Sequence, residues 1–377
     1  MLVCRRGLEP DAVSVLGDRF GGVDPVCVAD FERLAEERLD PGAFGYYAGG
    51  AGDELALRGN VDAWRALRLR PRVLVDVADV SAATTVLGTP VSMPLLVAPT
   101  AIQRLAHPDG EPGMARAAAA AGTIMCLSTL ATATPAEVAA AARDAPRWFQ
   151  LYVFRDRGVT RSFVQQAVDH GYGAIVLTVD APWLGRRERD LRTGFRIPEE
   201  IVVPSMAAMG EWEGATPLEL LGAIDPSLTW DDLAELRALA PLPLVLKGIQ
   251  TSEDASLAVE HGADAIVVSN HGGRQLDAVA PTATLLPEIV EAVDGRIEVY
   301  VDGGIRRGSD VVKALALGAR AVLAGRAPLW GLASGGEAGA RRVLELLQAE
   351  IELALALCGC ASPEAVSAAH LTRIGDP

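Results

Sequence analysis

The sequence predicts an α/β fold, a (β/α)8 TIM barrel with an N-terminal helical cap and a lid insertion after the fourth strand. The first observation is that eight short, β-rich apolar runs alternate with helical segments between Pro94 and Trp330. The second is that polar residues close most of these runs. The third is the length of 377 residues, which a decorated barrel reaches as one unit.

The first ninety residues hold helical signals such as "VADFERLAEERLD", together with the glycine-rich stretch "YYAGGAGDE". We expect residues 1–90 to form a helical extension that packs on the barrel rather than folding alone. Residues 91–377 then form the barrel.

The eight predicted strands follow in order along the chain. They are "LLVAPTA", "TIMCLST", "WFQLY", "AIVLTVD", "LPLVLKG", "DAIVVSNHGG", "IEVYVDGG" and "AVLAGR". Alanine-rich or amphipathic stretches between them predict the surrounding helices, among them "GEPGMARAAAAAG", "TPAEVAAAARD", "TSEDASLAVEHG" and "SDVVKALALGA".

Polar side chains gather at the C-terminal ends of these runs, which form the catalytic face of this fold. They are Gln150, Tyr152, Thr178, Asp180, Lys247, Ser269, His271, Asp302 and Arg326. The strand ends are evenly spaced except between Asp180 and Lys247, where the connection is far longer than usual. We interpret residues 190–229 of this connection as a lid.

Composition excludes several classes of protein. The formal net charge of −15 argues against nucleic acid or an anionic membrane as partner. Five cysteines without paired CxxC spacing indicate neither a disulfide framework nor a metal site, and a reducing cytoplasm fits best. No apolar run is long enough to span a membrane, and the N-terminus lacks the apolar core of a signal peptide.

Three strand-end residues carry acid–base or anion chemistry. His271 could be a hydrogen-bonded structural histidine, but its place at a strand end beside Arg274 favours a function. Lys247 ends a strongly apolar strand, where a buried lysine is costly unless it meets an anion. Asp180 could orient an imidazole, and its rival role as a helix cap is weakened because "APWLGRRERD" does not resemble a helix start.

Arginines indicate two anion sites. Arg186 and Arg187 are either solvated surface charges or, together with Arg274, a clamp for a carboxylate. The glycines after strands seven and eight, Asp302–Gly304 and Gly325–Arg326, are either tight loops or a phosphate site that Arg306 and Arg326 support. No triad of histidines and carboxylates predicts a metal. The set points to a phosphorylated cofactor and a small carboxylate substrate.

The chain resembles the FMN-dependent α-hydroxy acid oxidases and dehydrogenases, which include glycolate, lactate, mandelate and hydroxymandelate enzymes. The resemblance runs from about Ala29 to near the C-terminus. Besides "YYAGGAGDE", the stretches that carry it are "APTAIQRLAHPDGE", "WFQLYVFRDR", "LTVDAPWLGRRERD", "LVLKGI", "SNHGGRQLD", "VDGGIRRGSDVVKALALGA" and "AGRAPLW".

The resemblance implies FMN as cofactor and a role for each matching residue. His271 would be the active-site base, hydrogen-bonded to Asp180, and Lys247 would stabilise the reduced flavin. The substrate carboxylate and hydroxyl would meet Arg274, Arg187, Tyr46 and Tyr152. The flavin ring would face Pro99, Thr100, Ala101, Ser128, Gln150, Thr178 and Ser269. The ribityl chain and phosphate would meet Asp302, Gly304, Arg306, Gly325 and Arg326.

The implied reaction is oxidation of an (S)-2-hydroxy acid to the 2-oxo acid, with O2 or another acceptor reoxidising the flavin. Leu130 stands where glycolate-type members carry tryptophan, and Phe154 where they carry a second tyrosine. With Trp183 as a further apolar wall, these departures predict a substrate bulkier than glycolate, mandelate-like or long-chain, with a lactate-sized acid as the alternative. Ala101, where some dehydrogenases have glycine, favours an oxidase that forms H2O2. We expect a homo-oligomer, a tetramer or octamer.

Two other functions are alternatives. "DGGIRRGSDVVKALALGA" also resembles IMP dehydrogenase, but that chemistry needs a cysteine on a loop at a strand end, and none lies there. A flavin-binding protein without turnover is opposed by the set of buried charges, which are costly when unused.

Overall fold

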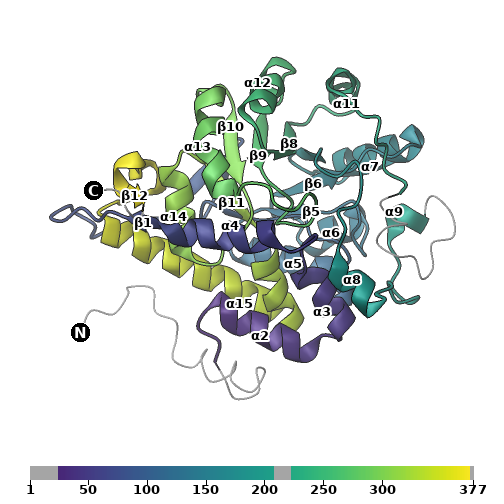
Figure 1. Ribbon diagram of the computed structural model, residues 1–377, viewed down its shortest axis with the longest axis horizontal. Coiled ribbons are helices and arrows are strands. Elements are labelled where there is room, and N and C mark those ends of the chain that lie inside the picture. Colours follow the sequence, from purple (N-terminus) through teal and green to yellow (C-terminus); the bar gives the residue numbers. More distant parts are fainter. Residues whose placement is uncertain (1–23, 208–221, 374–377) are drawn as a thin grey trace.

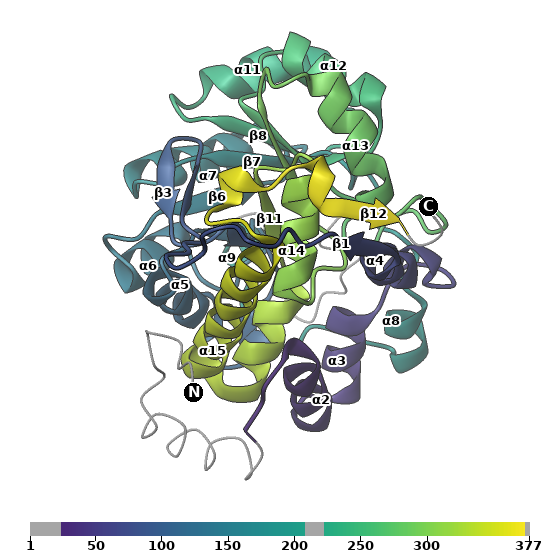
Figure 2. The same ribbon diagram turned by 90° about the vertical axis from the view of Figure 1, so that its left-hand side faces the viewer.

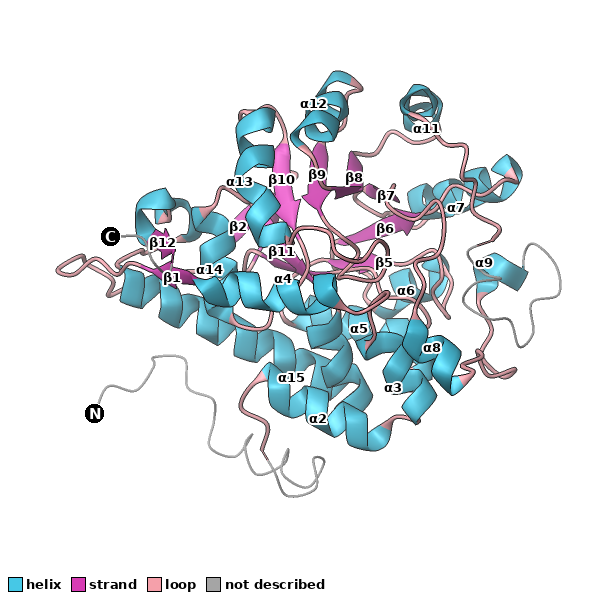
Figure 3. Ribbon diagram, viewed as in Figure 1, coloured by secondary structure: helices cyan, strands magenta, loops and turns pink. Residues whose placement is uncertain are grey.

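A closed barrel of eight parallel strands forms the centre of the computed structural model, which describes residues 24–207 and 222–373. Figure 3 shows the strands enclosed by helices. The strands are β4 (Leu95–Val97), β5 (Met125–Leu127), β6 (Arg147–Leu151), β7 (Ile175–Thr178), β8 (Leu244–Ile249), β9 (Ala265–Val268), β10 (Glu298–Val301) and β11 (Ala321–Ala324). Each pairs with the next along the chain, and β11 closes on β4. The predicted barrel and its eight strands are confirmed.

Helices follow the strands and cover the outside of the barrel (Figure 1). They are α5 (Gly110–Ala120), α6 (Pro135–Ala141), α7 (Arg157–Asp169), α11 (Leu233–Ala238), α12 (Ser252–Glu260), α13 (Thr282–Val293), α14 (Gly308–Ala316) and α15 (Arg326–Cys358). Side-chain caps fix several starts. The Thr134 hydroxyl accepts from the Glu137 amide before α6, and the Asp156 carboxylate accepts from the Gly158 amide before α7.

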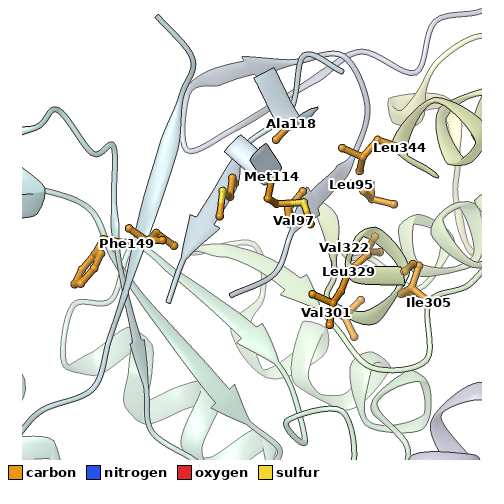
Figure 4. Close-up of a cluster of buried hydrophobic side chains, with 14 of the residues drawn as sticks. Leu95, Val97, Met114, Ala118, Phe149, Val301, Ile305, Val322, Leu329 and Leu344 are labelled. Carbon is orange, nitrogen blue, oxygen red and sulfur yellow. The ribbon is translucent and has the colours of Figure 1, made fainter. Parts of the chain in front are cut away.

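The alternation of side chains along the strands divides the core in two. Leu96, Trp148, Val267 and Tyr300 point into the barrel and form one buried cluster. Their neighbours point outward, because successive strand residues face opposite sides. Figure 4 shows this outer layer, where Leu95 and Val97 of β4 lie near side chains of α5 and α15, in a cluster that includes Met114, Ala118 and Leu344. Burial on both sides explains why the strands are continuous apolar runs.

The N-terminal region contains helices and strands. Helices α2 (Val28–Arg38), α3 (Pro41–Ala48) and α4 (Leu55–Ala66) come first, and α2 packs against α15, as both ribbon views show (Figures 1 and 2). Strand β1 (Leu67–Leu69) pairs with β12 (Leu371–Arg373) near the other end of the chain. The hairpin of β2 (Thr84–Val86) and β3 (Thr89–Val91) packs Val86 and Val91 onto the barrel interior, so the region is not purely helical.

The long connection between β7 and β8 contains α8 (Glu188–Thr193) and α9 (Pro204–Ala207) before it reaches α11. An isolated antiparallel bridge joins Ile224 of this connection to Phe154, which follows β6. The predicted lid spans residues 190–229, of which 208–221 lie outside the described residues. Short 3-10 turns occupy 103–105, 230–232, 363–365 and 368–370.

Candidate active site

A cavity of about 1120 Å³, open to solvent, lies at the C-terminal ends of the barrel strands. Strand ends form its floor, and Tyr46 and Tyr47 of α3 contribute from the N-terminal region. Most of the residues predicted from the sequence line it. They are Tyr46, Pro99, Thr100, Ala101, Ser128, Leu130, Gln150, Tyr152, Thr178, Arg187, Lys247, His271, Arg274, Asp302, Gly304, Arg306, Gly325 and Arg326.

Four predicted residues lie outside the lining. Asp180 and Ser269 stand directly behind it, hydrogen-bonded to lining residues. Phe154 is completely buried, and Trp183 is 76% exposed on the surface. The structure therefore brings neither of these aromatic side chains to the cavity wall within the described residues.

His271 and Asp180 form a pair across the strand ends. The Nδ1 atom of His271 lies 2.9 Å from Oδ1 of Asp180, and the hydroxyl of Ser269 accepts from the His271 amide at 3.1 Å. His271 takes a left-handed conformation with φ of 57°, which turns its ring out of the strand direction. The chain after Asp180 does not start a helix until Glu188, so Asp180 is not a helix cap.

The charge of each member of the pair follows from burial and from the charged groups around it. Desolvation lowers the pKa of His271 below its ordinary value, although the Asp180 carboxylate opposes this shift. Burial by itself would raise the pKa of Asp180, but the nearby His271 and Lys247 outweigh it and lower that pKa. At neutral pH the site thus holds a neutral imidazole on an ionised carboxylate, the state in which Nε2 can accept a proton.

Lys247 is a buried cation at the end of β8. Its Nζ atom lies 3.0 Å from Oδ2 of Asp302 and donates to the Ser269 hydroxyl at 3.0 Å. Burial would lower the pKa of Lys247, but the carboxylates of Asp302 and Asp180 raise it, so the ammonium stays charged. Oδ1 of Asp302 has no hydrogen-bond partner despite being buried.

Gln150 presents a second unpartnered polar atom. Its Oε1 atom accepts from the Thr129 amide at 3.1 Å and the Ser128 hydroxyl at 3.3 Å, which leaves the Nε2 donor facing the cavity side without a partner. A buried donor or acceptor without a partner costs free energy unless a ligand supplies one. Gln150 and Asp302 therefore offer a free donor and a free acceptor to a polar ligand in the cavity.

Arginines and helix starts surround one end of the cavity. Arg306 precedes α14, whose first amides already donate to Asp310 and Glu350. Arg326 opens α15, which has no side-chain cap, so its N-terminus favours an anion. Burial lowers the pKa of each guanidinium. Gly304 has φ of 82°, and a Cβ atom there would stand 2.4 Å from the Asn60 carbonyl oxygen, so only glycine fits.

The other end holds Arg274 and Arg187. The Arg274 guanidinium lies 5.0 Å from the centre of the Tyr46 ring and donates to the carbonyls of Tyr46 and Gly49. Arg187 is buried with an unpartnered Nε atom, and burial together with the charge of Arg274 lowers its pKa to about 10. Two neighbouring cations with free donors match a carboxylate. Tyr152 lines the cavity beside them.

Several lining or supporting residues were not identified from the sequence. The Tyr47 hydroxyl donates to the Ile102 carbonyl, and the Tyr47 carbonyl accepts from Arg326. The amides of Asn60 and Asn270 form two mutual hydrogen bonds beside the His271 loop. These residues join segments that are far apart in the sequence, and only the neighbouring tyrosine in "YYAGG" could have indicated Tyr47.

Metal and thiol chemistry find no support in the part of the chain that is described. No cluster of three histidine, cysteine or acidic side chains there could hold a metal ion. No cysteine lines the cavity formed by these residues. Within residues 24–207 and 222–373, no helix combines the length and apolar character that crossing a membrane requires.

Known proteins resemble this chain in sequence and in structure. The chain matches the family described as FMN-dependent dehydrogenase over residues 35–373. It is 49% identical over 357 residues to an L-lactate oxidase from Nostoc sp., covering 92% of this chain and 98% of that protein. It is 46% identical over 355 residues to the glycolate oxidase of Spinacia oleracea, covering 93% and 96%. A crystal structure of mandelate oxidase matches with a TM-score of 0.86 at 44% identity, covering 93% and 98%.

Proposed function

Because the chain belongs to the FMN-dependent dehydrogenase family, we propose that it oxidises an (S)-2-hydroxy acid to the 2-oxo acid and uses O2 as the electron acceptor. The observation that carries this proposal is the convergence of His271, Arg274 and Arg187 on one cavity, with Asp180 behind the imidazole. Such a site can bind a carboxylate and take a proton from the carbon or hydroxyl next to it.

The residues of the cavity fit FMN, the cofactor of the family. Arg306, Arg326 and the start of α15 would hold the phosphate, and Gly304 and Gly325 line the same cavity. The Gln150 amide would donate from its unpartnered Nε2 atom to the polar edge of the flavin ring system. The Lys247 ammonium would lie against the same edge, where its positive charge suits negative charge on the ring. Bound FMN supplies a two-electron acceptor for the substrate.

The residues at and near the carboxylate clamp, Arg274 and Arg187, have distinct roles in this proposal. The guanidinium groups of Arg274 and Arg187 would bind the substrate carboxylate, and Tyr46 and Tyr152 would donate to its oxygens. His271 would accept the proton that leaves the substrate, and the Asp180 carboxylate would orient the ring and balance its new positive charge. Lys247 would balance the negative charge that the ring system gains.

Leu130 supports a substrate bulkier than glycolate. It lines the cavity and is only 6% exposed, so its side chain forms part of the wall. Leucine leaves more room there than a tryptophan would, which favours a mandelate-like or long-chain acid. Mandelate oxidase matches at 44% identity and an L-lactate oxidase at 49%, so a lactate-sized acid is the alternative substrate. The proposal of O2 as acceptor, forming H2O2, rests on Ala101 beside the cavity and on relatives named as oxidases.

An anaerobic spectrum tests this function. Purified protein should carry yellow FMN that (S)-mandelate or (S)-2-hydroxyoctanoate bleaches, and air should restore the colour with one H2O2 per substrate. The variant His271→Ala should retain FMN but lose the bleaching. Colourless protein that does not respond to added FMN, or normal bleaching in the variant, would refute the proposal. Bleaching without H2O2 would refute only the acceptor.

A further inference from the structure

A bidentate ion pair lies just outside the cavity and belongs to none of the groups described so far. Nε of Arg189 lies 2.7 Å from Oε1 of Glu54, and its second terminal nitrogen donates to Oε2 at 2.8 Å. The Glu54 side chain is 15% exposed and that of Arg189 is 41% exposed. Two parallel contacts fix both direction and distance, which a single surface contact does not. Neither residue lines the cavity.

Glu54 closes a glycine-rich turn, Gly49–Glu54, which we name the brace. Oε1 of Glu54 also accepts from the Gly50 amide at 3.0 Å, so the carboxylate ties the turn to itself. Glu54 has φ of 60°, an unfavourable conformation for a residue with a Cβ atom. Burial would raise the pKa of Glu54, but the contacts with Arg189 lower it, so the carboxylate is ionised at neutral pH.

The brace bonds to the residue that precedes each arginine of the carboxylate clamp. The amide of Ala51 donates to the carbonyl of Gly273 at 2.8 Å, next to Arg274. The amide of Gly52 donates to the carbonyl of Arg186 at 2.9 Å, next to Arg187. The Gly49 carbonyl, at the start of the brace, accepts from Arg274 itself at 3.1 Å. One turn thus spans both halves of the clamp.

Arg189 ties the brace to the helix that follows Arg187. It lies in α8, whose first backbone bond runs from the Leu191 amide to the Arg187 carbonyl at 3.3 Å. Its stem packs against Gly45 of α3 and Gly49 of the brace, where an added Cβ atom would stand 3.7 Å from Cβ and 3.2 Å from Cδ of Arg189. A residue larger than glycine at position 49 would push Arg189 away from Glu54.

The clamp needs such support because its two members repel each other. Arg187 and Arg274 are both cationic, and the charge of Arg274 lowers the pKa of Arg187 more than the nearby Asp190 carboxylate raises it. Before the substrate carboxylate arrives, this repulsion favours movement of one arginine away from the other. A rigid connection between their backbones keeps them in place and reduces the cost of binding.

We propose that Glu54 and Arg189 are positioning residues that hold Arg274 and Arg187 at the spacing required by the carboxylate of the substrate. This inference rests on the proposed function and adds two residues to it that touch neither substrate nor cofactor. Loss of the ion pair should weaken carboxylate binding while leaving His271 and the flavin site in place.

Binding of oxalate to the FMN-loaded enzyme, measured by calorimetry, tests the inference, because oxalate carries carboxylates but has no C–H bond that the enzyme could oxidise. Arg189→Met keeps the packing of the stem and removes the charged head. It should raise the Kd for oxalate about tenfold, the range expected for residues coupled in one salt-bridge network. KM for the hydroxy acid should rise to a similar degree, whereas the limiting rate of anaerobic flavin reduction should change less than about threefold. Arg189→Lys should recover part of the affinity, because a lysine makes one contact instead of two.

The same helix offers a matched control. Arg192 pairs with Glu188 on the exposed side of α8 and does not contact the brace. Arg192→Met should leave the Kd for oxalate within twofold of the wild type. Glu54→Gln removes the charge of the partner and should resemble Arg189→Met. If Glu54→Gln fails to fold, the two Arg189 variants still decide.

Two results separate the inference from the function on which it rests. Oxalate affinity within twofold of the wild type in Arg189→Met overturns the positioning role, even if the variant is less stable to heat. If no hydroxy acid reduces the wild-type flavin, the proposed function fails. Weaker oxalate binding in Arg189→Met, but not in Arg192→Met, would then still support the clamp as an anion site held by this pair.

Discussion

The imidazole of His271 contacts Asp180 across the end of the strand that lies between them. His271 follows β9, Asp180 follows β7, and β8 with Lys247 stands between the two. The 2.9 Å contact therefore depends on the order of the strands in the sheet rather than on sequence proximity. Lys247 is held within reach of both and lowers the pKa of each, since a cation favours the neutral imidazole and the ionised carboxylate.

This arrangement predicts how the rate depends on pH. The pKa of His271 is lowered, so the ring remains neutral at pH values somewhat below the ordinary value of 6.5. A general base works only when neutral, so kcat/KM should be constant near neutral pH and fall as the pH decreases through this lowered pKa. A profile of kcat/KM between pH 4.5 and 8 measures it. A midpoint above 6.5 would contradict the assignment.

Asp180→Asn should change both the position and the height of that profile. The carboxylate raises the pKa of His271, so its removal should move the acidic limb to still lower pH. The maximum rate should nevertheless fall by about 10² to 10⁴-fold, because nothing then balances the charge of the imidazolium. Anaerobic stopped-flow reduction at saturating substrate gives this rate. A shift without a loss of rate would show that Asp180 only tunes the pKa.

The Lys247–Asp302 pair should contribute to stability as well as to the site. Lys247→Met leaves the Asp302 carboxylate buried without its cation, which typically costs about 3–5 kcal/mol. The double variant Lys247→Met, Asp302→Asn removes both charges and should recover most of this loss. Neither variant should reduce flavin at the normal rate. Urea unfolding of the flavin-free proteins, together with the reduction rate, separates the two effects, and equal stability of the two variants would contradict the charge argument.

Arg306 and Arg326 should behave differently although both line the phosphate end of the cavity. Arg306 donates to its neighbouring Ile305 carbonyl, whereas Arg326 donates to the carbonyls of Tyr47, Gly49 and Gly272, each at 2.9 Å. Arg306→Ala should weaken FMN binding about 10- to 100-fold, as expected for loss of one charged hydrogen bond, with little effect on the apoprotein.

Arg326→Ala should destabilise the apoprotein itself by about 2 kcal/mol, because the carbonyls of Tyr47 and Gly272 lose their donor and that of Gly49 keeps only Arg274. Calorimetric titration with FMN and thermal unfolding without FMN distinguish the two roles. If both variants lost only FMN affinity, the three carbonyl contacts of Arg326 would not be structural.

The strand ends could be predicted from the sequence because their signal is local. A buried parallel strand is a short apolar run, and a lysine or aspartate at its end is unusual enough to mark Lys247 and Asp180. Contacts between distant segments leave no such signal. Gly49 accepts from both Arg274 and Arg326, and the sequence separation of these residues gives no indication of that shared carbonyl.

The residues of the substrate pocket could be predicted only in part, because the sequence does not show in which direction the side chains of Phe154 and Trp183 point. The sequence predicts Phe154 and Trp183 as apolar walls of the pocket, Phe154 because it stands where related enzymes carry a tyrosine. Phe154 instead lies in the core beside its bridge to Ile224, and Trp183 faces outward, with its carbonyl bound by Gln275 at 2.8 Å. The backbone conformation of the loops determines these directions, and no periodic pattern in the sequence indicates it. Leu130 reaches the cavity because its backbone is fixed on both sides by bonds to Ile102 and Ser128.

The predicted substrate preference therefore depends on Leu130. Mandelate or 2-hydroxyoctanoate should exceed glycolate in kcat/KM, and Leu130→Trp should reverse this order by filling the space beside the clamp. Discrimination by apolar fit is worth about 1–3 kcal/mol per methylene-sized change, so the preference should be clear but not absolute. Leu130→Met conserves volume and should leave the order unchanged. Measuring glycolate, lactate, 2-hydroxyoctanoate and mandelate side by side with all three proteins tests this. A wild-type preference for glycolate would show that neighbouring side chains refill the space, so that Leu130 does not set the size of the substrate.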